Sequence, residues 1–537
     1  MAGYDYIILG AGAAGCVLAN RLSENPANEV LLVEAGSKPR HPAFTIPLLG
    51  STVFFNERFV WNYPTEPLGP SKGSEVWTRG KVVGGSTAIN GMVYNRGTAP
   101  DYDELERLGN KGWGWDDIVP AYQAFEDNPF GPSPTRGVGG PLKLDVVQQP
   151  DPMCDYLIRA GVALGFKQVE DINESDDERI GLSMANIRNG VRISAAKAFL
   201  DPVLKRPNLH LATETTVERL VFENGRAVGA VVRKEGATSE IRTRGEVIVA
   251  LGALNSPKLL QLSGVGPREV LENAGVPLYL ERDNVGRRML EHFCVVNTYR
   301  LSRDLGHNRH WRNNVEKAKT TLKYLGTRKG VLATPTGEVL ALFKSRPDVD
   351  RVDSQVLVSL MSIAGGTVRP DRPGGIDPLP GVSCMAEVLR STSEGSVWIT
   401  SADPNKPIAV DPNYLDTDYD RRTTVDLLRR LRELFSTSPL ADVVEHEILP
   451  GVDVQSDTDI IDAVLHNGTT GSHAINTCGM GPGDEDIVDD RLRVRGIDGL
   501  RIVDCSVMPS MISGNLNGPM MAMAWRAADL ILDKTGR

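Results

Sequence analysis

The sequence predicts an α/β fold with more than one domain, and three observations support this prediction. Two short apolar runs with a glycine-rich turn between them stand within residues 6–34, the pattern of a strand–helix–strand unit. A chain of 537 residues is too long for one ordinary hydrophobic core. Its composition, 41% hydrophobic and 24% charged, is typical of a globular protein.

The first unit has the pattern of a dinucleotide-binding site. An apolar run leads into Gly10, Gly12 and Gly15, and Glu34 closes a second apolar run at 30–33. Glycines at this spacing let a strand turn sharply into a helix and let backbone N–H groups approach a pyrophosphate. An acid about twenty residues further on can hold the ribose hydroxyls of the adenosine. We therefore expect a bound dinucleotide, with a tight turn that binds nothing as the alternative; NAD and FAD share this fingerprint.

The next segments follow in chain order. The apolar 40–59 loop is punctuated by proline and glycine, which favours packing against a neighbour, with a lid or pocket wall as the alternative. Helical periodicity runs over 101–128, interrupted by a glycine- and tryptophan-rich corner at 109–115. Residues 209–250 predict a small sheet around a turn at 223–225.

The region from about 293 to 470 is the expected place for a substrate-binding domain. Residues 397–400 and 409–410 predict antiparallel strands, and 423–434 predicts a charged helix. Near the end of the chain, Pro519 is expected as the first residue of a final helix that runs to about Lys534.

Charge and cysteine usage exclude several classes of protein. The net charge of −10 argues against nucleic acid or an anionic membrane as the main partner. The six cysteines are scattered without metal-binding spacing, so we expect buried, reduced thiols and no metal. The first strand begins too early to leave room for a signal peptide, and no apolar stretch approaches the length of a membrane span. We therefore expect a cytoplasmic protein.

Four further segments carry a family resemblance. They are residues 79–97 (RGKVVGGSTAINGMVYNRG), 252–266 (GALNSPKLLQLSGVG), 473–481 (HAINTCGMG) and 500–509 (LRIVDCSVMP). Together with the first unit, in this order and spacing, they resemble the glucose–methanol–choline (GMC) family of FAD-dependent oxidoreductases over essentially the whole chain.

The resemblance implies a domain organisation. A Rossmann-like FAD-binding domain, built from 1–150, 195–292 and 480–537, would be interleaved with an α+β substrate domain on an antiparallel sheet, built from 151–194 and 293–479.

The resemblance also implies the residues that hold FAD. Glu34 and the first glycines would take the ribose and pyrophosphate, Val217 would meet the adenine through its backbone, and Asp504 would lie beside the ribityl chain, although it could instead cap a turn. Some members link the flavin covalently to a histidine where this chain has Ile89, so we expect noncovalent FAD. The full expected set is Gly10, Gly12, Ala13, Ala14, Gly15, Glu34, Ala35, Val83, Gly84, Gly85, Asn90, Gly91, Met92, Val93, Val217, Asp504, Asn515, Pro519 and Met520.

Histidine is the expected general base, because oxidation of an alcohol by a flavin requires a group that takes the hydroxyl proton. His473 lies in a glycine- and threonine-rich turn, which favours an exposed functional ring, and His466 is its main rival. We expect a structural or surface role for each of the other histidines, which are His41, His210, His292, His307, His310 and His446. The resemblance places His473 beside flavin N5 as the base and Asn515 as its hydrogen-bonding partner, with activity rising around pH 6.5 if the pKa of His473 is unperturbed.

We therefore expect FAD-dependent oxidation of an alcohol, favouring a primary aromatic or aliphatic one, by hydride transfer to N5, with oxygen, a quinone or another carrier as acceptor. Several departures from the family pattern, such as Ala474-Ile475-Asn476 after the histidine, make it unsafe to transfer a substrate from the best-known members. An FAD-containing hydroxynitrile lyase with a redox-silent flavin is the main alternative, and a light-driven fatty-acid decarboxylase and a nicotinamide dehydrogenase remain open. We allow for a homodimer.

Overall fold

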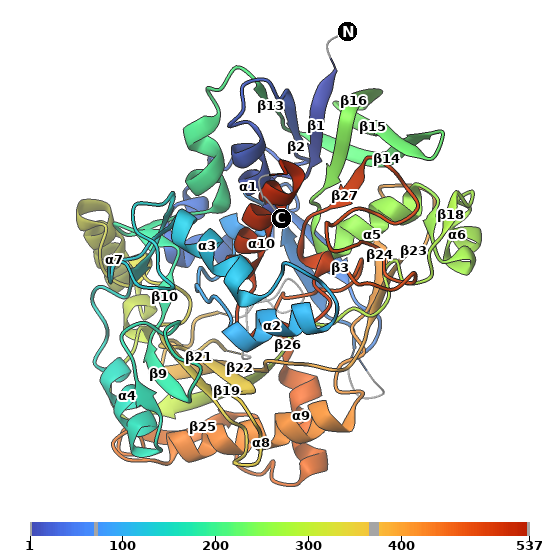
Figure 1. Ribbon diagram of the computed structural model, residues 1–537. Coiled ribbons are helices and arrows are strands. Elements are labelled where there is room, and N and C mark those ends of the chain that lie inside the picture. Colours follow the sequence, from blue (N-terminus) through green and yellow to red (C-terminus); the bar gives the residue numbers. More distant parts are fainter. Residues whose placement is uncertain (1–2, 69–72, 365–374, 534–537) are drawn as a thin grey trace.

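The computed structural model describes residues 3–68, 73–364 and 375–533. Within these residues the main α-helices, in chain order, are α1 (Ala13–Leu22), α2 (Ala99–Arg107), α3 (Trp115–Phe125), α4 (Met153–Ala163), α5 (Gly252–Leu262), α6 (Arg268–Ala274), α7 (Asn314–Thr327), α8 (Asp418–Phe435), α9 (Asp457–Asn467) and α10 (Asn517–Ile531). They surround two large sheets that occupy separate halves of the molecule (Figure 1).

The first sheet contains the dinucleotide-binding unit. Its strand order is β13-β2-β1-β16-β15-β14, and β27 also pairs with β16. The strands are β1 (Tyr4–Leu9), β2 (Val30–Val33), β13 (Leu209–Ala212), β14 (Thr215–Glu223), β15 (Arg226–Lys234), β16 (Ala237–Val249) and β27 (Leu500–Ile502). The long strand β16 pairs antiparallel with β15 through its first part and parallel with β1 and β27 through its last part. A parallel core is thereby continuous with an antiparallel meander.

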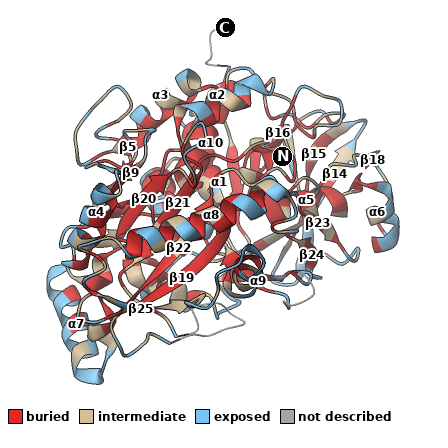
Figure 2. Ribbon diagram, turned by 90° about the horizontal axis from the view of Figure 1, so that it is seen from below, coloured by how far each residue is buried: buried red, intermediate tan, exposed pale blue. Residues whose placement is uncertain are grey.

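The second sheet is antiparallel through its centre. Its order is β25-β19-β22-β21-β20-β9-β8, with β26 also paired to β19 and only the edge pair β8–β9 parallel. The strands are β8 (Lys167–Gln168), β9 (Arg179–Leu182), β19 (Phe293–Leu301), β20 (Val339–Phe343), β21 (Ser354–Ser359), β22 (Gly381–Val388), β25 (Val444–Leu449) and β26 (Thr469–Thr470). Helices α4, α8 and α9 pack their apolar side chains against one face of this sheet. Its central strands are drawn as buried in Figure 2.

The remaining strands of the described structure form short pairs. They are β3 (Val60–Pro64) with β4 (Val76–Gly80), β5 (Glu126–Asp127) with β6 (Leu142–Lys143), β7 (Asp145–Val146) with β10 (Met184–Ala185), β11 (Ile187–Arg188) with β12 (Val191–Arg192), β17 (Val265–Gly266) with β18 (Leu280–Glu281), and β23 (Ser396–Ile399) with β24 (Ile408–Asp411).

Most of the expected elements are present. The 101–128 region forms α2 and α3 around the expected corner, the 223–225 turn joins β14 to β15, and the strands expected at 397–400 and 409–410 form the pair β23–β24. That pair packs its apolar side chains with residues of α5 and α6, although it falls in the range expected for the substrate domain. The domain boundaries themselves stay a prediction.

Two expected helices have other bounds. The charged helix expected at 423–434 begins earlier, since α8 starts at Asp418 after the cap Thr417, whose side chain accepts from the Asp420 N–H. Helix α10 begins at Asn517, so Pro519 is its third residue and not its first. The expected helix end at Lys534 lies outside the described residues.

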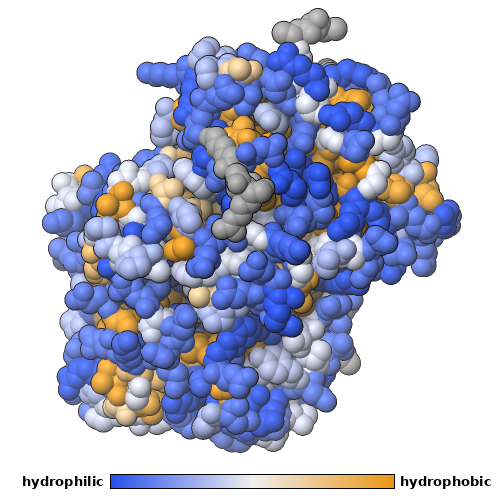
Figure 3. All heavy atoms as spheres, in the orientation of Figure 1, coloured by the Kyte–Doolittle hydropathy of each residue, from blue (hydrophilic) through white to orange (hydrophobic). Residues whose placement is uncertain are grey.

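The surface agrees with the composition. The face seen in Figure 3 is mainly hydrophilic, with hydrophobic side chains in small separate groups. Within the described ranges, no helix is both long enough and apolar enough to cross a membrane. All six cysteines are free thiols. Five of them are buried, as expected, and Cys505 is partly buried.

Candidate functional site

The first glycine loop, between β1 and α1, is packed so closely that two of its glycines have no room for a side chain. Gly10 has a φ of +104°, and a Cβ there would lie 2.4 Å from the Ala250 carbonyl oxygen. A Cβ at Gly15 would lie 1.8 Å from the carbonyl oxygen of Gly10. Gly12, in contrast, faces open space, with no atom within 4 Å of its Cβ position. A phosphate can therefore approach the N-terminal turn of α1 at Gly12.

The second glycine-rich loop lies directly against the first. The Gly84 N–H donates to the Ala11 carbonyl oxygen at 2.7 Å. Gly85 has a φ of +53°, and a Cβ there would lie 2.7 Å from Gly12 Cα. The structure thus brings together two segments that lie about seventy residues apart, as expected for loops that share one pyrophosphate.

Glu34 is tied to the first glycine loop. Its carboxylate accepts the Ala11 N–H at 3.0 Å and the Gly36 N–H at 2.8 Å. Burial raises its pKa to about 7, against the lowering effect of those two hydrogen bonds. An ionised carboxylate has about four lone-pair sites, so Glu34 can also accept from a ribose hydroxyl. Val217 lies nearby in β14, because Thr215 of this strand donates its N–H to the Glu34 carbonyl oxygen.

Asp504 acts as a cap. Its carboxylate accepts the Ser506 N–H at 2.9 Å, the Gly252 N–H at 2.9 Å and the Ser256 hydroxyl at 2.5 Å. The turn-capping alternative from the sequence is therefore what the structure shows. A place beside the ribityl chain stays a prediction.

The 90–93 segment is held by an arginine that sequence reasoning missed. Met92 has a left-handed φ of +66°, and its N–H donates to Asn90 Oδ1 at 3.2 Å. Arg192 donates to the Asn90 carbonyl oxygen at 2.7 Å and to its Oδ1 at 2.9 Å. The Arg192 side chain is buried, and burial lowers its pKa to about 9. A lone arginine in a mixed sequence gave no signal of this role.

His473 lies against His292, and their contacts fix which nitrogens carry hydrogen. The Nε2 of His292 is 3.0 Å from the Leu389 carbonyl oxygen, which can only accept, so this Nε2 carries the hydrogen. The Nδ1 atoms of the two rings are 3.0 Å apart, so in the neutral pair His292 accepts and His473 donates. The Nε2 of His473 is then left with a lone pair. Asn515 Nδ2 faces that lone pair at 3.3 Å.

The position of His473 differs from the expectation. It lies just after β26, which pairs with β19 directly after His292, so the two histidines meet although 181 residues separate them. Contrary to the expectation of an exposed ring, only 11% of the side-chain surface of His473 is accessible. His292, for which we expected a structural or surface role, is instead part of the site. The rival His466 is an exposed residue in the last turn of α9.

Two buried carboxyl groups and one arginine surround the two rings, and burial raises the pKa of both carboxyl groups, that of Glu291 to about 8. Glu387 of β22 is buried, with carboxylate oxygens 3.6 Å from His292 Nδ1 and 3.7 Å from His473 Nδ1. The Glu291 carboxylate accepts the His473 N–H at 2.7 Å and lies 3.7 Å from Arg79. Burial, with smaller effects of His292 and Arg79, holds the pKa of His473 well below its ordinary value. The ring is therefore neutral at physiological pH and can act as a base.

His292, Glu387 and His473 also meet the distance requirement for a metal site, because one ligand atom of each lies within 4.8 Å of the others. The two facing nitrogens are at hydrogen-bond distance, and the remaining nitrogens already contact Leu389 and Asn515. We interpret the cluster as a hydrogen-bonded network. That the protein needs no metal stays a prediction.

The N-terminus of α10 completes the site. Asn515 precedes the helix and Asn517 begins it. The Oδ1 atoms of both are buried without a hydrogen-bond partner in the described part of the chain. Buried amide oxygens and free N–H groups at a helix N-terminus suit the polar edge of a flavin, which offers donors and acceptors and carries negative charge when reduced. With the open side of Gly12, these atoms show that the residues present fit FAD.

Comparison with known proteins decides the family. The family model of the GMC oxidoreductase N-terminal domain matches residues 4–294, and the model of its C-terminal domain matches residues 391–524. The chain belongs to the GMC oxidoreductase family. It is therefore an FAD-containing oxidoreductase of the class that acts on CH–OH groups.

Similar proteins extend along the whole chain. It is 34% identical to an oxygen-dependent choline dehydrogenase of Brucella anthropi, over 99% of this chain and 96% of the relative. It is 33% identical to an alcohol dehydrogenase (acceptor) of Pseudomonas putida, over the same shares of the two chains. The crystal structure of pyridoxine 4-oxidase from Mesorbium loti superposes with a TM-score of 0.87 at 29% identity and covers 98% of both chains. These are oxidases and dehydrogenases, and nothing in them favours the lyase alternative.

Proposed function

We propose that this GMC oxidoreductase oxidises a primary aromatic or aliphatic alcohol to the aldehyde, with His473 as general base and Asn515 as hydrogen-bond donor to the substrate oxygen. The observation that carries the proposal is the meeting of His473 Nε2 with Asn515 Nδ2 at 3.3 Å, on the ring nitrogen left unprotonated by His292. FAD, when bound, supplies the acceptor for the hydride.

Four side chains of the site would perform the other steps of the reaction. His473 Nε2 takes the hydroxyl proton. Asn515 holds the hydroxyl oxygen and thereby orients the C–H bond of the carbon that carries it. His292 accepts from Nδ1 of His473 and keeps the ring in the basic tautomer. Glu387, when ionised, stabilises the positive charge that His473 gains on protonation.

An apolar cluster adjoins the site, and this favours an apolar alcohol. Val93 lies in an apolar cluster with Leu340, Leu342 and Leu389, and the carbonyl of Leu389 is the group that holds His292. The similar proteins named above act on choline, an alcohol and pyridoxine, all of which carry a CH–OH group. The name of the choline dehydrogenase specifies oxygen and that of the alcohol dehydrogenase leaves the electron acceptor open, so experiment must decide between oxygen and a quinone or other carrier.

The test compares two histidine variants of the FAD-loaded enzyme. His473→Ala is expected to slow anaerobic flavin reduction by an alcohol by about two to four orders of magnitude, the usual contribution of a general base. His466→Ala removes the exposed rival ring and is expected to leave the rate within about twofold. Near-normal reduction in His473→Ala, or a large loss in His466→Ala, would overturn the assignment of the base.

A further inference from the structure

Helix α7 exposes an apolar stripe. Val315, Leu322 and Leu325 are 61%, 68% and 58% exposed, and Ala318 between them is exposed as well. Residues three and four apart share one face of a helix, so these four side chains form a continuous row, here called the α7 stripe. Figure 2 shows α7 at one edge of the molecule, largely in the colour of exposed residues.

The opposite face of α7 attaches the helix to the protein. Thr320 and Tyr324 are its buried residues, and the Tyr324 hydroxyl donates to the Gly190 carbonyl oxygen at 2.8 Å. Each lies roughly half a turn around the helix from the α7 stripe. The stripe therefore points away from the protein, although apolar side chains exposed as a group usually mark an interaction surface.

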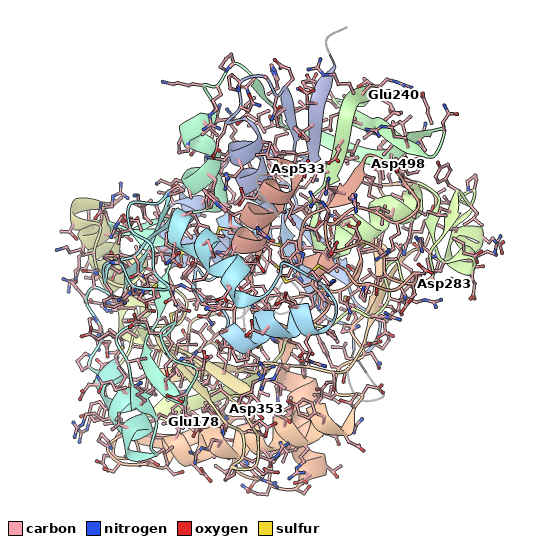
Figure 4. The ribbon with its side chains drawn as sticks, viewed as in Figure 1. Glu178, Glu240, Asp283, Asp353, Asp498 and Asp533 are labelled. Carbon is pink, nitrogen blue, oxygen red and sulfur yellow. The ribbon has the colours of Figure 1, made fainter. Side chains whose placement is uncertain are left out.

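The segment that contains α7 is rich in basic residues, although Arg309 and Arg312 are paired with Asp151 and Asp304. Residues 303–329 contain eight Lys and Arg but only two Asp and Glu, whereas the whole chain has a net charge of −10. Lys319 and Lys323 lie one helical turn apart along one side of the stripe, and Lys319 also pairs with Glu316 of the same helix at 2.7 Å. The acidic side chains labelled in Figure 4 at Glu240, Asp283 and Asp498 lie on the other side of the molecule from α7. At physiological salt the Debye length is about 8 Å, so these distant acidic side chains are screened from a lipid surface at α7.

The chemistry of the stripe favours lipid over protein as its occupant. Protein interfaces are enriched in aromatic residues and Arg and depleted in Lys, while the stripe is Val, Ala and Leu beside Lys. A stable dimer buries about 800 Å² on each partner, far more than the four aliphatic side chains of the stripe can supply. Aliphatic residues flanked by Lys are typical of helices that lie in the headgroup region of anionic membranes.

We propose that α7 docks the enzyme on an anionic lipid surface, with the α7 stripe among the acyl chains and Lys319 and Lys323 at the level of the phosphates. The earlier expectation that a net charge of −10 argues against an anionic membrane considered only the total charge. The distribution of charge puts a cationic, apolar helix at one edge of an acidic protein.

Vesicle flotation of the FAD-loaded protein tests this proposal. Wild type is expected to float with vesicles of equal parts phosphatidylcholine and phosphatidylglycerol, and not with phosphatidylcholine alone or in high salt. Leu322→Gln with Leu325→Gln should abolish flotation, and Lys319→Gln with Lys323→Gln should weaken it roughly thirtyfold. Val452→Gln, a change at a side chain 60% exposed elsewhere on the surface, is the matched control and should float like wild type.

Bound FAD and unchanged flavin reduction by alcohol in vesicle-free buffer establish that each variant is folded. Binding that is equal in wild type and the double-leucine variant would overturn the proposal, as would no binding of wild type to either vesicle. A wild-type dimer that the double-leucine substitution dissociates, without vesicle binding, would assign the stripe to a second copy of the chain instead.

Discussion

At the residue scale, the chemistry depends on the protonation state of His473. The groups that face its ring are His292, Glu387, Arg79 and Asn515. Burial and the neighbouring His292 and Arg79 lower its pKa well below the ordinary value of 6.5. Since the base is the neutral ring, flavin reduction should rise with pH, through a midpoint below 6.5, and be level at neutral pH. This expectation replaces the midpoint of about 6.5 expected for an unperturbed histidine. Stopped-flow measurement of flavin reduction across pH checks it. A midpoint at or above pH 6.5 would contradict the lowered pKa of His473.

His292 should control the tautomer of His473. His292→Ala removes the acceptor for Nδ1–H of His473, and we expect flavin reduction to slow by about two orders of magnitude, since a catalytic histidine in the wrong tautomer loses most of its activity. In His292→Asn the amide oxygen can stand close to the position of Nδ1, and part of the rate should return. The absorption spectrum of bound FAD serves as the control for folding. A rate for His292→Ala within a few fold of wild type would rule out this positioning role.

The sequence was informative about some of these residues and silent about others. His473 and Asn515 stand in motifs whose order along the chain points to their roles. His292, Glu387 and Arg192 come from three other places in the chain, and only the pairing of β26, β19 and β22 brings the first two to His473. A single sequence carries no signal of such long-range pairing, so His292 was expected to be structural.

At the element scale, the two glycine loops must touch in order to hold the cofactor. Gly85→Ala places a Cβ 2.7 Å from Gly12 Cα at a φ of +53°, and we expect loss of most of the bound FAD. Gly236→Ala is the matched control, because Gly236 has a φ of +82° with nothing within 4 Å of its Cβ position. It carries similar backbone strain without a clash. The ratio of flavin to protein absorbance after purification measures the effect, and equal FAD content in both variants would contradict this account of the loops.

Element positions were predictable where local chemistry determines them. The turn between β14 and β15 contains Asn224 and Gly225, both with positive φ, as Asn-Gly predicts for a tight hairpin. The start of α10 was misplaced by two residues because the N–H groups of the first helical turn have no partner within the helix. Proline is therefore tolerated at the third position as well as at the first.

At the scale of the whole molecule, the α/β class and the presence of two sheets follow from the sequence, but their connection does not. Strand β16 belongs to the antiparallel meander at one end and to the parallel core at the other. Its sequence has exposed, alternating residues first and a fully buried apolar end, which indicates a strand throughout and gives no sign that its partners change. The division into domains, the homodimer and the cytoplasmic location stay predictions.

The central claim is that this GMC oxidoreductase takes hydride and proton from an alcohol at the site of His473 and Asn515. The most direct test mixes the FAD-loaded enzyme anaerobically with a panel of aromatic, aliphatic and cationic alcohols and follows the flavin absorbance. We expect one class, with primary aromatic or aliphatic alcohols favoured, to bleach the flavin, and readmitted air then to show whether oxygen is the acceptor. A flavin that stays oxidised with every class of alcohol would contradict the claim.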